Sequence, residues 1–337
     1  MLKVSVIGAG SWGTALATVL QKNGHDVTVW SIMEDEINSM REHGEHLTKL
    51  PGVKLSEEIH LTTDIEEAVK DKAMLILAVP SIFTRSTAKL MKPYVTDKQI
   101  VVSVAKGIEE ETLMVLTEVI EDELPQADVA VLCGPSHAEE VGRGIPTTVV
   151  AGAKSRETAE FIQSVFMNDF FRVYTTPDIL GMELGGALKN VIALAAGMAD
   201  GLGYGDNTKA ALITRGIAEI SRLAVAMGAN ERTLSGLTGT GDLIVTCASM
   251  HSRNRRAGIL MGQGKTMEEA MAEVQMVVEG VYSAKAAKKL ADKYQISLPI
   301  VEQVNRVLFE GVQAKEAVKE LMLRNKKIEH WDLNWNE

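Results

Sequence analysis

Short apolar runs alternate with longer amphipathic stretches through the first half of the chain. Runs of β-branched and other apolar residues are typical of buried strands, whereas apolar residues spaced three or four apart are typical of helices. This alternation predicts a parallel sheet with crossover helices. The predicted strands are residues 3–8, 26–30, 74–79, 100–105, 129–133, 147–151 and 171–174, and the predicted helices are 14–21, 34–43, 63–70, 84–91, 112–123 and 156–166.

The pattern changes after Thr176–Asp178. From Met182 onward apolar residues recur at helical spacing and strand-like runs become rare, which predicts an all-helical second domain. We place the two domains at residues 1–180 and 181–337. The tail beyond Lys326, with Trp331 and Trp335, is expected to be loosely ordered or folded back onto the helices. The helices predicted in the second domain are 182–199, 207–227, 255–262, 266–273, 281–293, 299–309 and 314–323.

The first predicted strand ends in a glycine-rich loop. Gly8, Gly10 and Gly13 form a G-x-G-x-x-G pattern directly after the strand and before an apolar helix. In such a loop the first glycine permits a tight turn, the second lets a diphosphate approach the backbone, and the third lets the helix pack on the strand. The first half is therefore interpreted as a Rossmann-like dinucleotide-binding domain. The alternative is a plain strand–helix turn.

Composition and charge narrow the class of protein. The chain of 337 residues is 46% apolar and carries a formal charge of −10, which argues against general nucleic-acid binding. We identify no apolar stretch long enough to span a bilayer and no signal peptide, so a cytoplasmic protein without a membrane partner is expected. Cys133 and Cys247 lie far apart and are expected to be buried core residues. The histidines lack metal-ligand spacing, so no metal is expected.

Lys189 is the only charged residue between Leu184 and Ala199, in an otherwise apolar or small helix. Gly185 and Gly186 permit another backbone to approach closely. A partly desolvated ammonium group loses preference for its charged state, so its pKa falls and the lysine can act as a general base for an alcohol proton. The alternative is an ammonium group that reaches solvent past apolar neighbours.

Two further segments follow predicted strands, at the sheet edge where the carboxyl ends of parallel strands line a ligand crevice. Lys106 ends one strand and is either a ligand-binding residue or an ordinary surface lysine. The segment Cys133–Ala138 offers backbone amides and the Ser136 hydroxyl at the same edge. We expect its histidine, His137, to be a capping or surface group rather than an acid–base residue.

A second glycine-rich turn, Gly236–Asp242, ends in a carboxylate, and ten residues later Ser252–Arg256 places several donors at the start of a helix. Arginine pairs well with phosphate oxygens, and a helix N-terminus adds its own positive end. Within an acidic chain this basic cluster predicts a clamp for a phosphate or carboxylate. The alternative is a solvated helix start whose arginines pair with surface carboxylates.

Together these motifs resemble those of bacterial-type NAD(P)-dependent glycerol-3-phosphate dehydrogenases. The resemblance covers nearly the whole chain except the tail, and a series of motifs in this order is far more specific than one glycine loop. It implies reversible hydride transfer between NAD(P)H and dihydroxyacetone phosphate or sn-glycerol 3-phosphate, which supplies glycerol 3-phosphate for glycerophospholipid synthesis. The motifs are Gly8–Thr14, Ala105–Gly107, Gly134–Glu140, Gly185–Asn190, Asp200–Asn207, Gly239–Asp242 and His251–Asn254.

The resemblance also implies roles for individual residues. Lys189 would accept the proton of the substrate's C2 hydroxyl, with Lys106 and Asp242 setting the charge around it and Asn190 and Thr246 close by. Substrate contacts would come from Lys106, Gly134, Ser136, Lys189, Asp242, Ser252, Arg253 and Asn254. Cofactor contacts would come from Gly8, Gly10, Ser11, Trp12, Gly13, Lys106, Ala138, Arg253, Val277 and Glu279.

The segment after the second predicted strand departs from this family. Ser31 is followed by Ile32 and Met33 and then by the carboxylates of Glu34–Glu36, where many members of the family have His or Arg. Carboxylates would repel the 2′-phosphate of NADP, and Ser31 can bond either a ribose hydroxyl or a phosphate. We therefore expect use of NAD, or of both cofactors.

Two other functions stay open on the residues alone. A related Rossmann dehydrogenase of a 3-hydroxy acid or sugar acid would explain Lys189 but not the arginine cluster with its second glycine turn. A non-catalytic regulator that senses dinucleotide would have no need of a lone lysine in an apolar helix. We also expect a homodimer, because large helical second domains often associate.

Overall fold

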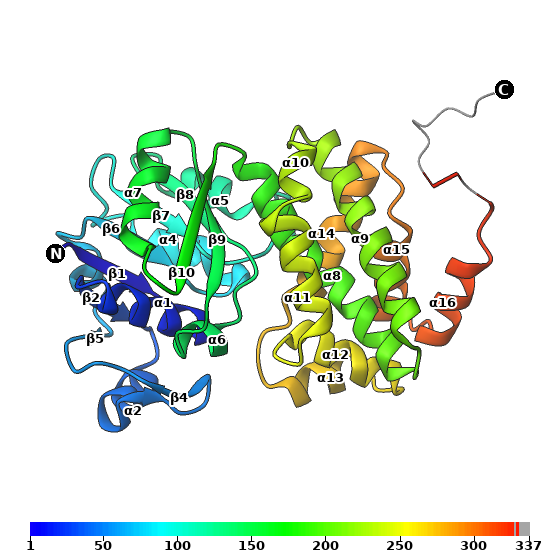
Figure 1. Ribbon diagram of the computed structural model, residues 1–337, viewed down its shortest axis with the longest axis horizontal. Helices are drawn as coiled ribbons and strands as arrows, with labels where there is room; N and C mark the ends of the chain where they lie inside the picture. Colours follow the sequence, from blue (N-terminus) through cyan, green and yellow to red (C-terminus); the bar gives the residue numbers. More distant parts are fainter. Residues whose placement is uncertain (327, 330–337) are drawn as a thin grey trace.

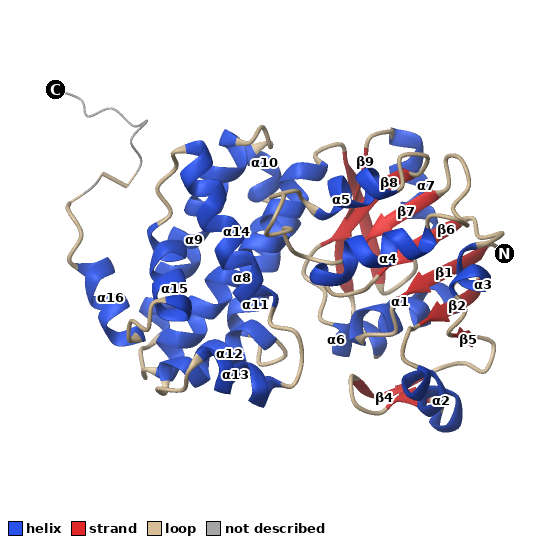
Figure 2. Ribbon diagram, turned by 180° about the vertical axis from the view of Figure 1, so that it is seen from behind, coloured by secondary structure: helices blue, strands red, loops and turns tan. Residues whose placement is uncertain are grey.

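Residues 1–326, 328 and 329 are described by the computed structural model, and they form two lobes that lie side by side (Figure 1). The N-terminal half forms an eight-stranded sheet covered by helices on both faces, and the C-terminal half forms a lobe of helices (Figure 2). The predicted fold class, a Rossmann-like α/β domain followed by an all-α domain, is confirmed. Trp331 and Trp335, for which a loose or folded-back tail was expected, lie outside the described residues.

The sheet has the strand order β10-β9-β8-β7-β6-β1-β2-β5. From β1 the chain first adds β2 and β5 on one side and then adds β6 and the later strands on the other side. The strand order therefore reverses at β1. In open α/β sheets ligands bind outside the carboxyl ends of the strands at such a reversal, which is where the glycine loop begins. The strands are β1 (Lys3–Ile7), β2 (Asp26–Trp30), β5 (His60–Thr62), β6 (Met74–Leu77), β7 (Ile100–Ser103), β8 (Asp128–Cys133), β9 (Thr147–Ala153) and β10 (Phe171–Thr176).

The expectation of a wholly parallel sheet is wrong at one pair. β9 runs antiparallel to β8, with Ala130 opposite Ala153 and Cys133 opposite Val150, whereas the other neighbours in this sheet are parallel. A parallel neighbour needs a crossover that carries the chain back along the full strand, usually a helix. The segment between β8 and β9 contains only the five-residue helix α6 (Ala138–Gly142), so the chain turns back directly.

Helices cover the sheet on both faces. Residues of α1 and α7, such as Leu16 and Ile162, share a buried cluster on one face, and Met91 and Ile120 of α4 and α5 share another on the opposite face. These helices are α1 (Ser11–Lys22), α2 (Glu34–His43), α3 (Ile65–Val69), α4 (Thr84–Met91), α5 (Leu116–Glu123) and α7 (Arg156–Phe166). Sequence periodicity missed β5, α6 and the hairpin of β3 (Glu45–His46) and β4 (Leu50–Lys54), because each is too short to show a repeat.

The 23-residue helix α8 (Ile179–Gly201) is the core of the second lobe. It is long and apolar enough to cross a membrane by length and composition, with a mean hydropathy of 1.4, so the expectation of no such stretch is wrong. Its apolar character has another cause, because 83% of that segment is buried among neighbouring helices. The other helices of this lobe are α9 (Asp206–Ala226), α10 (Glu231–Leu234), α11 (Asp242–Ala248), α12 (Arg253–Gly262), α13 (Met267–Val274), α14 (Glu279–Tyr294), α15 (Pro299–Phe309) and α16 (Ala314–Met322).

A buried carboxylate ties the two lobes together. Glu183, in the first turns of α8, accepts hydrogen bonds from the Thr117 backbone N–H at 3.2 Å and from the Thr117 hydroxyl at 2.5 Å. Thr117 belongs to α5 of the sheet lobe, whose first turn has backbone amides free to donate. Burial raises the pKa of Glu183 to about 7, against the opposing effect of the Thr117 bonds.

Helices α8 and α12 touch backbone to backbone. A Cβ on Gly197 would lie 2.1 Å from the Arg255 carbonyl oxygen, and one on Gly258 would lie 2.2 Å from the Leu194 carbonyl oxygen. We expect Gly258→Ala to lower the free energy of unfolding by about 3 kcal/mol, because backbone cannot move aside as a flexible side chain can. Chemical denaturation measures this loss. Gly205→Ala is the control, since a Cβ there meets nothing within 4 Å; an equal loss in both variants would contradict the close-contact explanation.

Candidate active site

The loop between β1 and α1 has the geometry that a dinucleotide requires. Gly8 has a φ of +122°, and a Cβ there would lie 2.8 Å from the backbone carbon of Ala78. Gly10, in contrast, faces open space, where a Cβ would meet nothing within 4 Å. It is also the N-cap of α1 and offers no side-chain cap, so the first amides of the helix are free for an external anion. The loop therefore fits the diphosphate of a nicotinamide dinucleotide.

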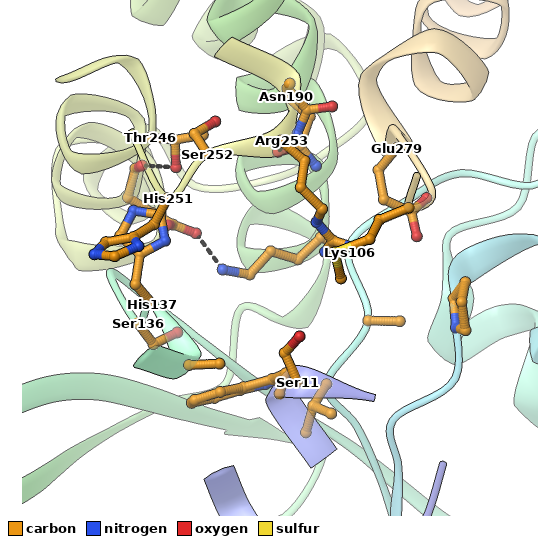
Figure 3. A pocket seen from close by; sticks show the side chains of 18 of the residues that line it. Ser11, Lys106, Ser136, His137, Asn190, Thr246, His251, Ser252, Arg253 and Glu279 are labelled. Atoms are coloured by element: carbon orange, nitrogen blue, oxygen red, sulfur yellow. Dashed lines mark hydrogen bonds and ion pairs between the residues drawn. The ribbon is translucent and has the colours of Figure 1, made fainter. Parts of the chain in front are cut away.

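A cavity lies between the glycine loop and the helical lobe (Figure 3). Both lobes line it: Ser11 and Lys106 come from the sheet lobe, and Lys189 and Asp242 come from the helical lobe. Most of the side chains predicted from the sequence meet here. The predicted residues that line the cavity are Ser11, Trp12, Lys106, Ser136, Ala138, Lys189, Asn190, Asp242, Thr246, Ser252, Arg253, Asn254 and Glu279.

Two ammonium groups share one carboxylate at the centre of this cavity. The Lys189 Nζ lies 2.5 Å from Asp242 Oδ1, and the Lys106 Nζ lies 2.7 Å from Asp242 Oδ2. Lys106 also donates to the Gly134 carbonyl at 3.1 Å. Lys189 donates at 2.7 Å to the Thr246 hydroxyl, which itself donates to the Asp242 carbonyl at 2.6 Å. Lys189 therefore does not reach solvent past its neighbours, and its ammonium group is held by α11.

The two lysines differ in proton affinity although burial acts on both. It lowers the pKa of Lys189 to about 8, and the positive charge of Lys106 adds to this against the opposing effect of Asp242. Burial also acts on Lys106, but the Asp242 carboxylate outweighs it and raises the pKa of Lys106. The two ammonium groups likewise outweigh burial at Asp242 and lower the pKa of its carboxyl. Lys189 is thus the member of this group that loses its proton nearest to neutral pH.

Two asparagines connect the helices behind the cavity. The Asn254 amide donates to Asn190 Oδ1 at 3.0 Å, and the Asn254 carbonyl oxygen accepts from the Gly280 N–H at 2.8 Å. Ser252 caps α12 by accepting from the Arg255 N–H at 3.2 Å. These bonds fix the first turn of α12 against α8 and α14, so the side chains of that turn are held in place at the cavity wall.

The arginine cluster at the start of α12 divides between two faces. Arg253 and Arg256 line the cavity, whereas Arg255 turns away and pairs with Asp200, its Nη2 lying 2.7 Å from Oδ2. The expected clamp of Ser252–Arg256 is therefore corrected at Arg255 alone. Arg253 and Arg256, three residues apart, share the helix face at the cavity, whereas Arg255 points toward Asp200. Burial lowers the pKa of the Arg253 guanidinium, and neighbouring Glu279 opposes this.

Glu279 links the two lobes at the cavity wall. It is the first residue of α14, and it accepts from the Ser81 N–H at 3.0 Å and from the Ser81 hydroxyl. Burial raises the pKa of Glu279, while Ser81 and Arg253 oppose that shift. Ser81 begins a 3-10 turn, Ser81–Phe83, after β6 and was not predicted as a site residue.

Some predicted residues lie next to the cavity rather than on its wall. Gly134 is not part of the cavity lining, and its carbonyl accepts a hydrogen bond from Lys106, which is. Val277 is not part of the lining, although the adjacent Met276 is. Ser31 and the loop glycines also lie outside the lining, further along the carboxyl edge of the sheet.

His137 differs from the expectation of a capping or surface group. It precedes α6 but makes no capping bond, and its ring lines the cavity with a buried Nε2 that has no hydrogen-bond partner among the described residues. His251 and Glu139 also line the cavity and were not predicted as site residues. A single histidine in a loop has no sequence pattern that would reveal such a position.

The Glu36 carboxylate, which follows β2 in the sequence, is bonded to three neighbouring side chains. Glu36 accepts from the Ser31 hydroxyl at 2.5 Å and from His46 Nε2 at 2.8 Å, and it pairs with the Lys49 ammonium. These partners outweigh burial and lower the pKa of Glu36 to about 2. Lys49, which the sequence did not single out, also accepts from the Ser11 hydroxyl at 2.6 Å through its carbonyl. The repulsion expected from this carboxylate is therefore partly neutralised by Lys49 and His46.

A dinucleotide-type loop and a buried, easily deprotonated lysine that face the same cavity are features of a nicotinamide-dependent oxidoreductase of an alcohol or carbonyl group. Comparison with known proteins identifies the family. Residues 3–159 match the model of the NAD-dependent glycerol-3-phosphate dehydrogenase N-terminus, and residues 178–319 match that of the C-terminus. The chain belongs to this family, as its sequence motifs predicted.

The chain also matches individual relatives over nearly their whole length. The chain is 69% identical to the glycerol-3-phosphate dehydrogenase [NAD(P)+] of Agathobacter rectalis, over 99% of this chain and 100% of the relative. It is 54% identical to the enzyme of the same name from Bacillus subtilis, over 99% and 97%. The crystal structure of glycerol-3-phosphate dehydrogenase from Coxiella burnetii superposes with a TM-score of 0.93 at 36% identity, covering 96% of this chain and 99% of that one.

Proposed function

We propose that this protein catalyses the reversible, NAD(P)-dependent interconversion of dihydroxyacetone phosphate and sn-glycerol 3-phosphate. The observation that carries the proposal is the buried Lys189 Nζ, 2.5 Å from Asp242 and with a pKa of about 8. In the oxidation of glycerol 3-phosphate, neutral Lys189 accepts the C2 hydroxyl proton. In the reverse direction, protonated Lys189 donates a hydrogen bond to the C2 carbonyl oxygen and returns the proton.

Residues of both lobes, most of them in the sheet lobe, are proposed to bind the cofactor. The open backbone at Gly10 and the first amides of α1 receive the diphosphate, with Ser11 and Trp12 beside it. Bound nicotinamide supplies the two-electron acceptor or donor. The further proposed cofactor contacts are Gly8, Gly13, Ser31, Lys106, Ala138, Arg253, Val277 and Glu279.

The substrate is proposed to lie between the lysine pair and the start of α12. Arg253 and Ser252 supply donors for its phosphate, and Lys106 with Asp242 fixes the charge beside the reacting carbon. Thr246 positions the Lys189 amine, and Asn190 positions Asn254 through their 3.0 Å bond. The remaining proposed substrate contacts are Gly134, Ser136 and Asn254.

The decisive assay follows absorbance of the reduced nicotinamide after dihydroxyacetone phosphate is added. We expect oxidation of NADH, with NADPH used equally or less well, since ionised Glu36 accepts hydrogen bonds and would repel a 2′-phosphate.

Glu36→Gln is expected to raise the ratio of kcat/KM for NADPH to that for NADH several-fold. No oxidation of either cofactor would refute the proposed function, and a strong NADPH preference in the unaltered protein would refute the proposed cofactor preference.

The direction of the pH dependence follows from Lys189. As a base it must be neutral, so kcat/KM for glycerol 3-phosphate oxidation is expected to rise with pH and level off above about 8. As an acid it must be protonated, so kcat/KM for dihydroxyacetone phosphate reduction is expected to fall above about 8. Initial rates from pH 6 to 10 in both directions test this. Profiles that bend the same way in both directions would contradict the role of Lys189.

Three broader properties are part of the same proposal. We place the domains at residues 1–180 and 181–337; β10 ends at Thr176 and α8 begins at Ile179, which supports this boundary. We propose a cytoplasmic homodimer without nucleic-acid or membrane partners; the net charge of −10 supports only the absence of a nucleic-acid partner. The product glycerol 3-phosphate would supply glycerophospholipid synthesis.

A further inference from the structure

His137 has an unpaired polar atom in a ring that lines the active-site cavity. It follows β8 and precedes α6, and its ring lies beside Ser136 at the cavity wall (Figure 3). Its Nε2 is buried and has no hydrogen-bond partner within the described part of the chain. Buried polar atoms in folded proteins nearly always have a partner, so an unpaired nitrogen on a ring that lines a cavity calls for a ligand.

A second histidine packs against it from the other lobe. The His251 ring centroid lies 5.6 Å from that of His137, with an angle of 53° between the ring planes. His251 directly precedes Ser252 and α12, and its Nδ1 lies 3.9 Å from Glu139 Oε1. The contact fixes the His137 ring at the junction of the lobes, where the Ser136 and Ser252 hydroxyls come from opposite sides.

The charges around the ring favour an anion. Burial lowers the pKa of His137, and the nearby Lys189 and Lys106 ammonium groups lower it further, against Glu139 and Asp242. The ring is therefore neutral at neutral pH, and one of its nitrogens carries a proton that it can donate. Donors from Ser252 and Arg253 line the same cavity, whereas the Ser136 hydroxyl donates to the Gly134 carbonyl at 2.9 Å. A phosphate group offers several acceptor oxygens for such a set of donors.

We propose that His137 binds the phosphate group of the substrate through Nε2, together with the hydroxyl of Ser252 and the guanidinium of Arg253. This inference rests on the proposed function, because that function supplies a phosphorylated substrate. His137 is then a determinant of specificity for phosphorylated over unphosphorylated substrates, and it takes no part in proton transfer at C2.

Two variants of His137 test the proposal. His137→Phe keeps a ring of similar shape without nitrogen and is expected to raise the KM for dihydroxyacetone phosphate about 10- to 100-fold, the loss typical of a hydrogen bond to a charged group. His137→Gln places an amide donor near the position of Nε2 and is expected to restore most of the loss. The kcat at saturation and the Kd of the cofactor are expected to stay within about twofold of the unaltered protein.

Binding of inorganic phosphate, measured by calorimetry, separates a phosphate contact from a contact to the carbon chain. A phosphate contact predicts that His137→Phe weakens phosphate binding by a factor similar to its effect on KM. A raised KM with unchanged phosphate binding, an unchanged KM, or a loss that glutamine does not restore would each overturn the proposal. Calorimetry requires no turnover, so its result is independent of whether the proposed reaction occurs.

A matched control is available in the same lobe. His25 also has a buried ring nitrogen without a partner, but its Nε2 lies 3.2 Å from the Val165 carbonyl and it does not line the cavity. His25→Gln is expected to leave both KM and phosphate binding unchanged. Equal losses in this control and in His137→Phe would show that the effect arises from altered folding and would overturn the phosphate contact.

Discussion

Replacement of Lys189 by alanine is expected to lower kcat by about 10²- to 10⁴-fold, the usual contribution of a general acid–base group. Of the two lysines in the cavity, Lys189 loses its proton more easily, because its pKa is lowered to about 8 whereas that of Lys106 is raised. Lys106 cannot replace it, because its ammonium group stays charged beside Asp242 at 2.7 Å. Steady-state rates in both directions measure the effect.

The same variant must still bind cofactor. Trp12 lies at the cavity wall beside the glycine loop, so quenching of its fluorescence by NADH reports binding without turnover. We expect the Kd of NADH to change by less than about threefold, since Lys189 lies in the other lobe. Turnover within tenfold of the unaltered protein would contradict the assignment of Lys189 as the base, and loss of NADH binding would indicate a folding defect instead.

Asp242→Asn is expected to cause the largest loss of stability. Asp242 is almost wholly buried, and its two carboxylate oxygens serve two ammonium groups, at 2.5 and 2.7 Å. Removal of the charge leaves both lysines buried without a counter-charge, and breaking a buried pair in this way costs about 3–5 kcal/mol. Chemical denaturation at pH 7 measures the loss. The pKa of Lys189 should also fall further, because Asp242 is the group that opposes the effect of burial.

An exposed ion pair provides the comparison. Glu66 and Lys70 form an i,i+4 pair on the surface of the sheet lobe, with side chains about half exposed. Glu66→Gln removes one carboxylate in the same way, and we expect no measurable change in the denaturation midpoint. If Asp242→Asn were as stable as Glu66→Gln, the cavity would have to be far better solvated than its burial indicates.

Longer elements could be predicted from the sequence because their patterns repeat. The apolar spacing of residues 182–199 and the uncharged run around Lys189 indicated both the core helix α8 and the unusual lysine. The direction of β9 could not be read, because parallel and antiparallel strands share the same alternation. The expectation of no membrane-length apolar stretch failed because Glu183 and Lys189 interrupt the segment, whereas its mean hydropathy is still high enough for a spanning helix.

Sequence periodicity could not identify the hydrogen-bond partners of Lys189. Asp242 and Thr246 are far from it in the chain, and only the family resemblance brought them together before the structure did. Helix geometry places Arg253 and Arg255 on different faces of α12, although their closeness in sequence led us to expect a single binding cluster. Ser81, Lys49 and His137 stand in loops or turns whose positions depend on tertiary packing, so no local pattern marked them.

The bond between Glu183 and Thr117 bears on how ligands enter the cavity. Because this bond anchors the central helix of one lobe to the other lobe, we expect the two lobes to move as one rigid body and not to open and close about a hinge. The bonds from Ser81 to Glu279 join the lobes at a second place. We therefore expect ligand binding to proceed without the slow rotation of one lobe against the other, which takes microseconds to milliseconds in proteins that close around their ligands.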